Sequence, residues 1–177
     1  ASFDGINCVG GTTRAFFGGG AQPSGWSDRV MAVNFASKGN CCDWNNLTEA
    51  RRDVTATGNS IKGIYAGGSN PSNNVIDTIQ QFIQSSMANC TDFGDLTTTI
   101  KRSAPSQSPT RGLIGGGETP STTAVIDYIT FTTQGNASDF GDLTAATEYL
   151  GGNSNSTRGL FGGGYAAGGT NTISYVT

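Results

Sequence analysis

The residues in this chain that could do chemistry recur at a fixed spacing. A basic residue opens the same short motif four times, in steps of 48, 49 and 47 residues, at Arg14, Lys62, Arg111 and Arg158. A hydrolase of the sialidase kind would need three arginines near an acid. A residue repeated in every copy of a motif is more typical of architecture than of catalysis, so we expect these four to be structural.

Acidic residues also recur as pairs, namely Asp92/Asp95 and Asp139/Asp142. Clustered carboxylate oxygens are the ligands that Ca²⁺ prefers. The first copy of the motif, however, has Asp43 with Asn46 and keeps the rest of the pattern. Such short acids commonly accept hydrogen bonds from turn amides. We therefore expect turn-forming residues here and no metal site.

Catalytic machinery is not evident. The chain has no histidine, which removes the commonest general base and metal ligand. Glu49, Glu118 and Glu148 occupy different places in the repeat, so no carboxylate pair recurs for hydrolysis. The glycine triplets lack the Gly-Lys-Ser/Thr of a phosphate loop. The sequence predicts no catalytic residue, no cofactor and no enzyme activity.

Composition and charge argue against two classes of partner, nucleic acids and membranes. The formal net charge is −3, only 13% of residues are charged, and lysine and arginine are scattered along the chain with never more than two in succession. Nucleic-acid-binding proteins carry a clustered basic face, so we expect no nucleic acid. No apolar run reaches the length of a membrane span and no signal segment opens the chain, so we expect no membrane contact.

Four cysteines, an even number typical of secreted proteins, are present as Cys8, Cys41, Cys42 and Cys90. Their spacing matches no zinc site. A bridge between the adjacent Cys41 and Cys42 would be strained, so a disulfide, if one forms, should run to Cys8 or Cys90. Four free thiols remain the equal alternative.

Two motifs show that the chain is a tandem repeat. The first ends in a glycine run and has copies at residues 13–20, 61–68, 110–117 and 157–164. The second joins an asparagine, an aspartate, an aromatic residue and a leucine, with copies at residues 40–47, 89–96 and 136–143. Both keep the same period, and chance does not readily place two independent motifs in one phase.

Each repeat contains about four short strands. A segment rich in small residues precedes the glycine-ended strand, a β-branched run follows it, and the aspartate-aromatic strand comes last. We place the β-branched strands at residues 30–33, 75–79, 125–129 and 172–176, and we expect no helix at residues 80–87. This pattern predicts an all-β propeller with blades at about residues 1–48, 49–97, 98–144 and 145–177, the last lacking its fourth strand.

The repeat resembles the kelch repeat over essentially the whole chain. The resemblance rests on the paired glycines that end an apolar strand and on an aromatic residue before a leucine, which is Trp44, Phe93 or Phe140. Kelch blades carry tryptophan at that place, so the two phenylalanines are departures. A string such as TRGLFGGG followed by GNASDFGDLT is similar to kelch-like repeats in virion proteins of marine tailed phages.

The loops that follow the glycine runs leave one face of such a propeller. They are polar, with two aromatic residues among hydroxyl and amide side chains, a mixture that suits sugars. The residues we expect to bind a ligand there are Trp26, Asn70, Asn73, Tyr165 and Asn171.

The resemblance implies a virion surface or extracellular protein of a structural kind, a tail-fibre or capsid-attached propeller. Its expected partners are other virion proteins or copies of itself, with cell-surface glycans as the ligand that its loops suit. One alternative is an extracellular adhesin or appendage subunit of a cell. The other is a propeller hydrolase or lyase, which would require an acid or arginine cluster near the axis.

Overall fold

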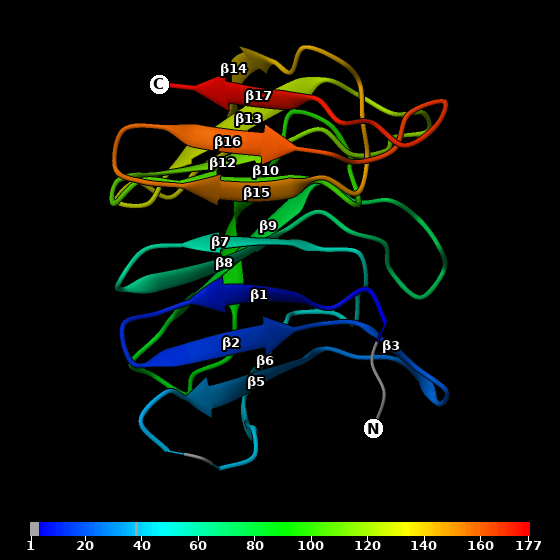
Figure 1. The fold of residues 1–177 in the computed structure, drawn as a ribbon. Coiled ribbons are helices and arrows are strands. Elements are labelled where there is room, and N and C mark those ends of the chain that lie inside the picture. Colours follow the sequence, from blue (N-terminus) through cyan, green and yellow to red (C-terminus); the bar gives the residue numbers. More distant parts are fainter. Residues whose placement is uncertain (1–3, 38) are drawn as a thin grey trace.

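The computed structural model describes residues 4–37 and 39–177, and in that part of the chain every regular element is a β-strand. The first three residues of the predicted first blade, and residue 38 within it, lie outside the described residues. The strands form four antiparallel sheets arranged as the blades of a four-bladed β-propeller (Figure 1). The predicted fold class is confirmed.

The strands of each blade follow the chain in order from the axis outward. Blade 1 comprises β1 (Asn7–Gly10), β2 (Arg14–Gly18), β5 (Arg29–Asn34) and β6 (Cys42–Asn46), and a small hairpin, β3 (Ala21–Gln22) with β4 (Gly25–Trp26), lies in its longest loop. Blade 2 comprises β7 (Thr55–Gly58), β8 (Lys62–Ala66), β9 (Thr78–Ile83) and β10 (Thr91–Asp95). Blade 3 comprises β11 (Ala104–Gln107), β12 (Arg111–Gly115), β13 (Val125–Thr130) and β14 (Ser138–Asp142). Blade 4 has three strands, β15 (Gly151–Ser154), β16 (Gly159–Gly162) and β17 (Ile173–Val176).

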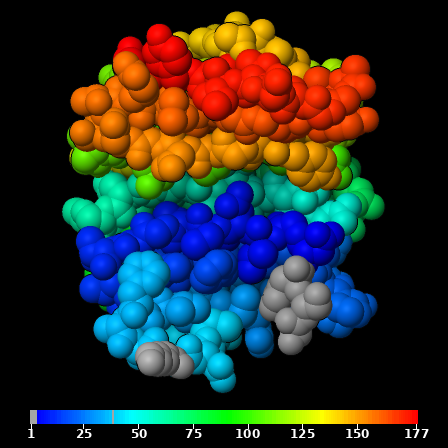
Figure 2. Space-filling model, viewed as in Figure 1, coloured from blue at the N-terminus to red at the C-terminus, as the bar shows by residue number. Residues whose placement is uncertain are grey.

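The blades follow one another in chain order. The innermost strands contact in the sequence β1, β7, β11 and β15. In the space-filling view the blue band of blade 1, the teal band of blade 2 and the orange and red band of blade 4 lie one above another, with the green and yellow of blade 3 showing behind blade 4 (Figure 2). Residues at the same place in different repeats therefore lie at the same radius and height around one axis.

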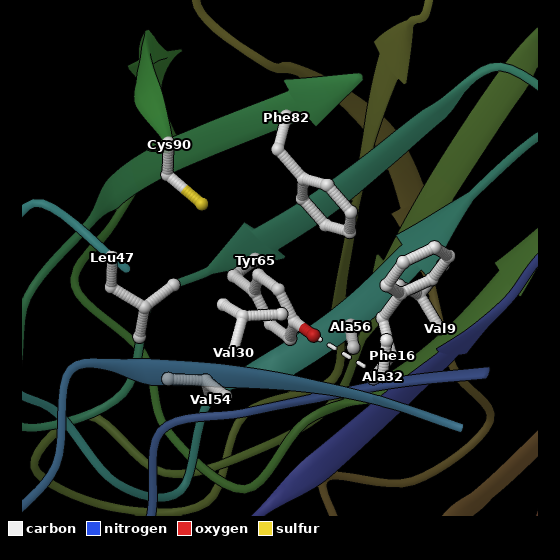
Figure 3. Packing of buried hydrophobic residues seen from close by; sticks show 10 residues of the cluster. All are labelled: Val9, Phe16, Val30, Ala32, Leu47, Val54, Ala56, Tyr65, Phe82 and Cys90. Atoms are coloured by element: carbon white, nitrogen blue, oxygen red, sulfur yellow. Dashed lines mark hydrogen bonds between the residues drawn. The ribbon is translucent and has the colours of Figure 1, made fainter. Parts of the chain in front are cut away.

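Alternating side chains of the glycine-ended strands fill the three spaces between successive blades. In β2 the Phe16 ring packs toward blade 2, where it meets Tyr65 and Phe82 (Figure 3). The Tyr65 hydroxyl, which is fully buried, donates a hydrogen bond to the Phe16 carbonyl oxygen at 3.1 Å. Ile64, its neighbour in sequence, points the other way and packs in the cluster between blades 2 and 3. Period-two alternation thus gives each blade two apolar faces.

Glycine permits the close approach of neighbouring blades. A Cβ atom on Gly152 of β15 would lie 1.8 Å from the Pro105 carbonyl oxygen of β11, and one on Gly18 would lie 2.5 Å from the Tyr65 ring. Both distances are far shorter than van der Waals contact. The expectation that glycines line the blade contacts is confirmed at these positions.

A buried polar side chain in the third strands of blades 2 and 3 joins each of these two blades to the one before. Gln80 in β9 accepts a hydrogen bond from the Thr48 backbone N–H at 2.9 Å, and Asp127 in β13 accepts one from the Thr97 N–H at the same distance. This equivalence corrects the strand placed at residues 75–79, because β9 begins three residues later. Val75 instead pairs with Ser69 and closes a loop longer than its counterpart in blade 3.

Candidate functional site

Four equivalent residues form an arc along the propeller axis. Gly5, Asp53, Arg102 and Tyr149 each precede the innermost strand of a blade, and all four have positive φ angles, of 67°, 55°, 59° and 57°. The Asp53 N–H donates to the Gly5 carbonyl, the Arg102 N–H to that of Asp53, and the Tyr149 N–H to that of Arg102, at 2.9, 3.1 and 3.0 Å. A left-handed backbone is unfavourable for Asp53, Arg102 and Tyr149, which are not glycine. Backbone strain of this kind is found preferentially at functional sites.

This arc lines the mouth of a cavity of about 340 Å³. All four blades contribute to its wall, through residues 4–7, 52–54, 102–103 and 149–150. The loops that follow the glycine runs flank the same mouth, because backbone pairing joins Arg52 to Ser69, Lys101 to Glu118 and Glu148 to Tyr165. The cavity is therefore the concave centre of the face that the loops surround, and its volume is that of a small-molecule site.

Arg102 is the hub of the charged groups at this mouth. Its Nη1 donates to Glu118 Oε2 and, at 3.2 Å, to Glu148 Oε2, while its Nε lies 3.6 Å from Asp53 Oδ2. Arg52 Nε approaches the same Asp53 oxygen at 3.8 Å, and Lys101 Nζ lies 3.5 Å from Glu118 Oε1. Three cations and three carboxylates from three blades thus form one network.

The electrostatics favour the charged forms of Glu118 and Arg102. Burial alone would raise the pKa of the Glu118 carboxyl, but the charges of Lys101 and Arg102 outweigh it and hold that pKa below its ordinary value. Burial would likewise lower the pKa of Arg102, but its hydrogen bond to Glu148 and the nearby acids raise it. With its charges paired, the site offers alternating donors and acceptors rather than a net charge.

Two aromatic residues border the network. The Arg52 guanidinium lies over the Trp26 ring at 4.7 Å, and that of Arg102 over the Tyr149 ring at 4.8 Å. Such stacking fixes the guanidinium planes. Tyr149 keeps 59% of its surface exposed, so one part of its ring is available to a ligand.

The recurring basic residues lie elsewhere and stack on aromatic rings in their own blades. Arg14 lies over Trp44 at 4.7 Å, Arg111 over Tyr128 at 5.1 Å and Arg158 over Tyr175 at 4.9 Å. Lys62 takes the same place over Phe93, at 5.7 Å. These contacts give the four residues the architectural role expected of them.

The five loop residues proposed from the sequence are dispersed. Trp26 contacts the axial network, because the Arg52 guanidinium lies over its ring. Asn70 uses its side-chain oxygen to accept hydrogen bonds from the Ser72 and Asn74 N–H groups, both at 3.1 Å, so it shapes its own loop. Asn73 is exposed there with a φ of 62°, and Asn171 is exposed just before β17. Tyr165, half exposed, pairs through its backbone with Glu148 beside the cavity.

The paired acids and the cysteines complete the sequence-based candidates. Asp139 accepts a hydrogen bond from the Gly141 N–H at 2.8 Å, as expected of a turn residue. Among the described residues, no group of three or more acidic or cysteine side chains is placed to hold a metal ion. All four cysteines are free thiols: Cys90 is buried between blades 1 and 2, Cys8 is half-buried, and Cys41 and Cys42 are exposed.

Sequence reasoning missed the axial network because its members come from different places in the repeat. Glu118 follows a glycine run, whereas Glu148 precedes an innermost strand, so the two share no motif position. A signal was nevertheless present. Charged doublets stand before two innermost strands at the repeat spacing, as Arg52-Asp53 and Lys101-Arg102.

No protein-family model matches the chain, and no curated protein matches it. Within residues 4–37 and 39–177, no helix is present that is long and apolar enough to cross a membrane. Among solved structures, one entitled "Structure of YjhT" is similar, with a TM-score of 0.76 and 11% sequence identity. The match covers 92% of this chain and 59% of that one, so this chain spans well under two thirds of its length. At this identity the likeness establishes the propeller fold and nothing further.

Proposed function

We propose that this chain is a non-catalytic propeller module of a virion surface, a tail-fibre or capsid-attached protein, which binds cell-surface glycans at its axial face. The kelch-like repeat and its similarity to virion proteins of marine tailed phages support the location. The observation that carries the binding role is the axial network around Arg102, which three blades build at the mouth of a cavity lined by all four.

The chemistry of that mouth suits a sugar. A neutral glycan offers hydroxyl groups that donate to carboxylates and accept from guanidinium groups, and a network with three charges of each sign supplies both. The exposed ring of Tyr149 and the indole of Trp26 provide apolar faces beside these groups. A strongly charged ligand of either sign would be repelled by the three groups of its own charge.

Binding to a glycan array tests this role. We expect the chain to retain at least one class of surface glycan and Tyr149→Ser to lose it. Tyr175→Ser is the matched control, because Tyr175 is similarly exposed and also lies beneath an arginine, but on blade 4 away from the mouth. Retention of no glycan, or equal loss by both variants, would contradict axial binding. Immunogold labelling of source particles tests the virion location, and labelling of cell surfaces instead would favour the adhesin.

The hydrolase or lyase is a second candidate, because an acid and arginine cluster does lie near the axis. Against it, a general acid needs a carboxyl with a raised pKa, whereas Glu118 has a lowered one and all three acids contact Arg102. We expect no release of reducing ends from any glycan that the array identifies. Release that disappears in Glu118→Gln would establish the enzyme.

A further inference from the structure

A groove of about 250 Å³ lies on blade 2, beside the end of β9 and the loop that leads to β10. Lys62 at the start of β8 lines it, and its other lining residues lie between Gln81 and Thr91. Blade 2 contacts blade 1 on one side and blade 3 on the other, so the groove belongs to the interior of the row of blades. An engineered cavity of about 150 Å³ holds a benzene ring, so this groove is large enough for a ring that carries a polar group.

Two polar groups at this groove lack partners among the residues that the structure describes. The side-chain oxygen of Gln81, Oε1, is buried and accepts no hydrogen bond there. Lys62 forms no ion pair with any described residue, and its Nζ lies 5.7 Å from the centroid of the Phe93 ring. A buried acceptor without a donor is costly, and a ligand that donates a hydrogen bond to it would remove that cost.

The equivalent place in blades 3 and 4 holds a tyrosine ring. In the sheet registers, Tyr128 of β13 and Tyr175 of β17 occupy the position that Gln81 occupies in β9. Each tyrosine ring lies beneath the arginine that is equivalent to Lys62, with the guanidinium carbon 5.1 and 4.9 Å from the ring centroid. The repeat therefore has a place for an aromatic ring between its basic residue and its third strand.

Blade 1 fills that place by another route, and blade 2 does not fill it. In blade 1 the position equivalent to Gln81 is Ala32, and the large ring of Trp44 lies 4.7 Å beneath Arg14. Blade 2 combines the glutamine with the smaller ring of Phe93. Among the described residues, only its basic residue has no aromatic ring as close as 5.1 Å. The groove corresponds to the place that a tyrosine ring takes in blades 3 and 4.

We propose that this groove binds a phenol group, supplied by a tyrosine side chain of a peptide or by a free phenolic compound. The ring lies beneath the Lys62 ammonium, because the face of an aromatic ring attracts a cation. The phenol hydroxyl bonds the Gln81 amide. Since that hydroxyl both donates and accepts, it can pair with the amide in either orientation. No residue that lines this groove also lines the axial cavity, so the inference is independent of glycan binding.

Titration of the intact chain with para-methylphenol, followed by nuclear magnetic resonance, tests the site. We expect amide shifts centred on the residues that line the groove. The analogue para-methylanisole, which lacks the donated hydrogen, should bind about tenfold more weakly, because the buried amide oxygen stays unpaired. Lys62→Met should weaken binding of para-methylphenol about twofold to fivefold, since it removes the cation and keeps an apolar stem.

Gln81→Tyr is the decisive variant, because it supplies from the chain itself the ring that Tyr128 supplies in blade 3. We expect it to abolish binding while the thermal midpoint stays at or above that of the wild type. Gln22→Tyr is the matched control, because Gln22 lies in the small hairpin of blade 1, outside the groove. Gln81→Leu provides a second test. Without the amide, the variant should bind para-methylphenol and para-methylanisole equally.

A parallel titration with N-acetyl-tyrosinamide separates the two sources of the phenol. Binding at least as tight as that of para-methylphenol would support a tyrosine side chain of a peptide, and weaker binding would support a free phenolic compound. Three results overturn the proposal: amide shifts that do not include the groove, equal binding of para-methylanisole to the wild type, or undiminished binding to a folded Gln81→Tyr variant.

Discussion

Replacing Arg102 by glutamine should destabilise the propeller in a pH-dependent way. The substitution removes a guanidinium that lies within 3.6 Å of Asp53 and 3.2 Å of Glu148 and also donates to Glu118. The side chains involved are between 14% and 24% exposed. Breaking a fully buried ion pair by removing one partner costs about 3–5 kcal/mol, and an exposed pair contributes about 0–1 kcal/mol. For this partly buried hub we expect a loss of about 2–3 kcal/mol at neutral pH.

The pH dependence follows from the lowered pKa of Glu118. A carboxyl whose pKa is lower in the folded chain than in the unfolded one stabilises the fold above its unfolded pKa, and this contribution disappears as the pH falls through the folded value. The difference between wild type and Arg102→Gln should therefore be largest at neutral pH and should shrink in acid.

Urea denaturation followed by circular dichroism at neutral and acid pH measures both effects. Arg29→Gln is the matched control, because Arg29 pairs with Asp43 at 3.8 Å while the two side chains are 60% and 57% exposed. We expect it to change stability by less than about 0.5 kcal/mol. An Arg102→Gln variant as stable as this control at neutral pH, or one whose deficit is the same in acid, would refute the reasoning.

Three further predictions concern the spaces between blades. Arg51→Met should cost about 2–4 kcal/mol in urea denaturation, because the fully buried guanidinium donates to the Gly67 and Thr78 carbonyls at 3.2 and 3.1 Å; methionine leaves the Gly67 carbonyl unpaired and the Thr78 carbonyl with the Gly67 N–H alone, and a neutral result would contradict this. Gly152→Ala should lower the thermal midpoint markedly, since its Cβ would meet the Pro105 carbonyl, whereas Gly10→Ala, with nothing within 4 Å, should not; equal midpoints would remove the steric argument. Alkylation at mildly basic pH, read by mass spectrometry, should label the exposed Cys41 and Cys42 first and Cys90 only on unfolding, because burial raises the pKa of the Cys90 thiol to about 12; early labelling of Cys90 would show that the first blade interface opens.

The repeat made much of the fold predictable. Glycine runs and aspartate-aromatic segments in one phase indicated the blades, since turn chemistry and period-two alternation are local properties of the sequence. The third strand of blade 2 was misplaced because Val75-Ile76-Asp77 repeats the letters of Val125-Ile126-Asp127. The structure aligns β9 with β13 through the burial of Gln80 and Asp127, which depends on the neighbouring blade.

The candidate site was less predictable than the fold. Arg102 and Glu148 are 46 residues apart, and their contact depends on blades 3 and 4 being adjacent. Arg111 and Arg158 are conspicuous in the sequence because they recur. Recurrence, however, indicates a structural role that every blade requires, not a binding site. Residues that differ among equivalent positions, as Gly5, Asp53, Arg102 and Tyr149 do, are where one blade can act differently from another.

The backbone arc at the axis has a consequence for how such a protein can change. Each of its three links joins a main-chain N–H to a main-chain carbonyl, so these hydrogen bonds do not depend on which side chains the arc carries, provided that they tolerate a left-handed backbone. The path of the backbone is thus separable from the identity of the side chains around the cavity. Single substitutions at the rim can change those side chains while the backbone beneath keeps its course.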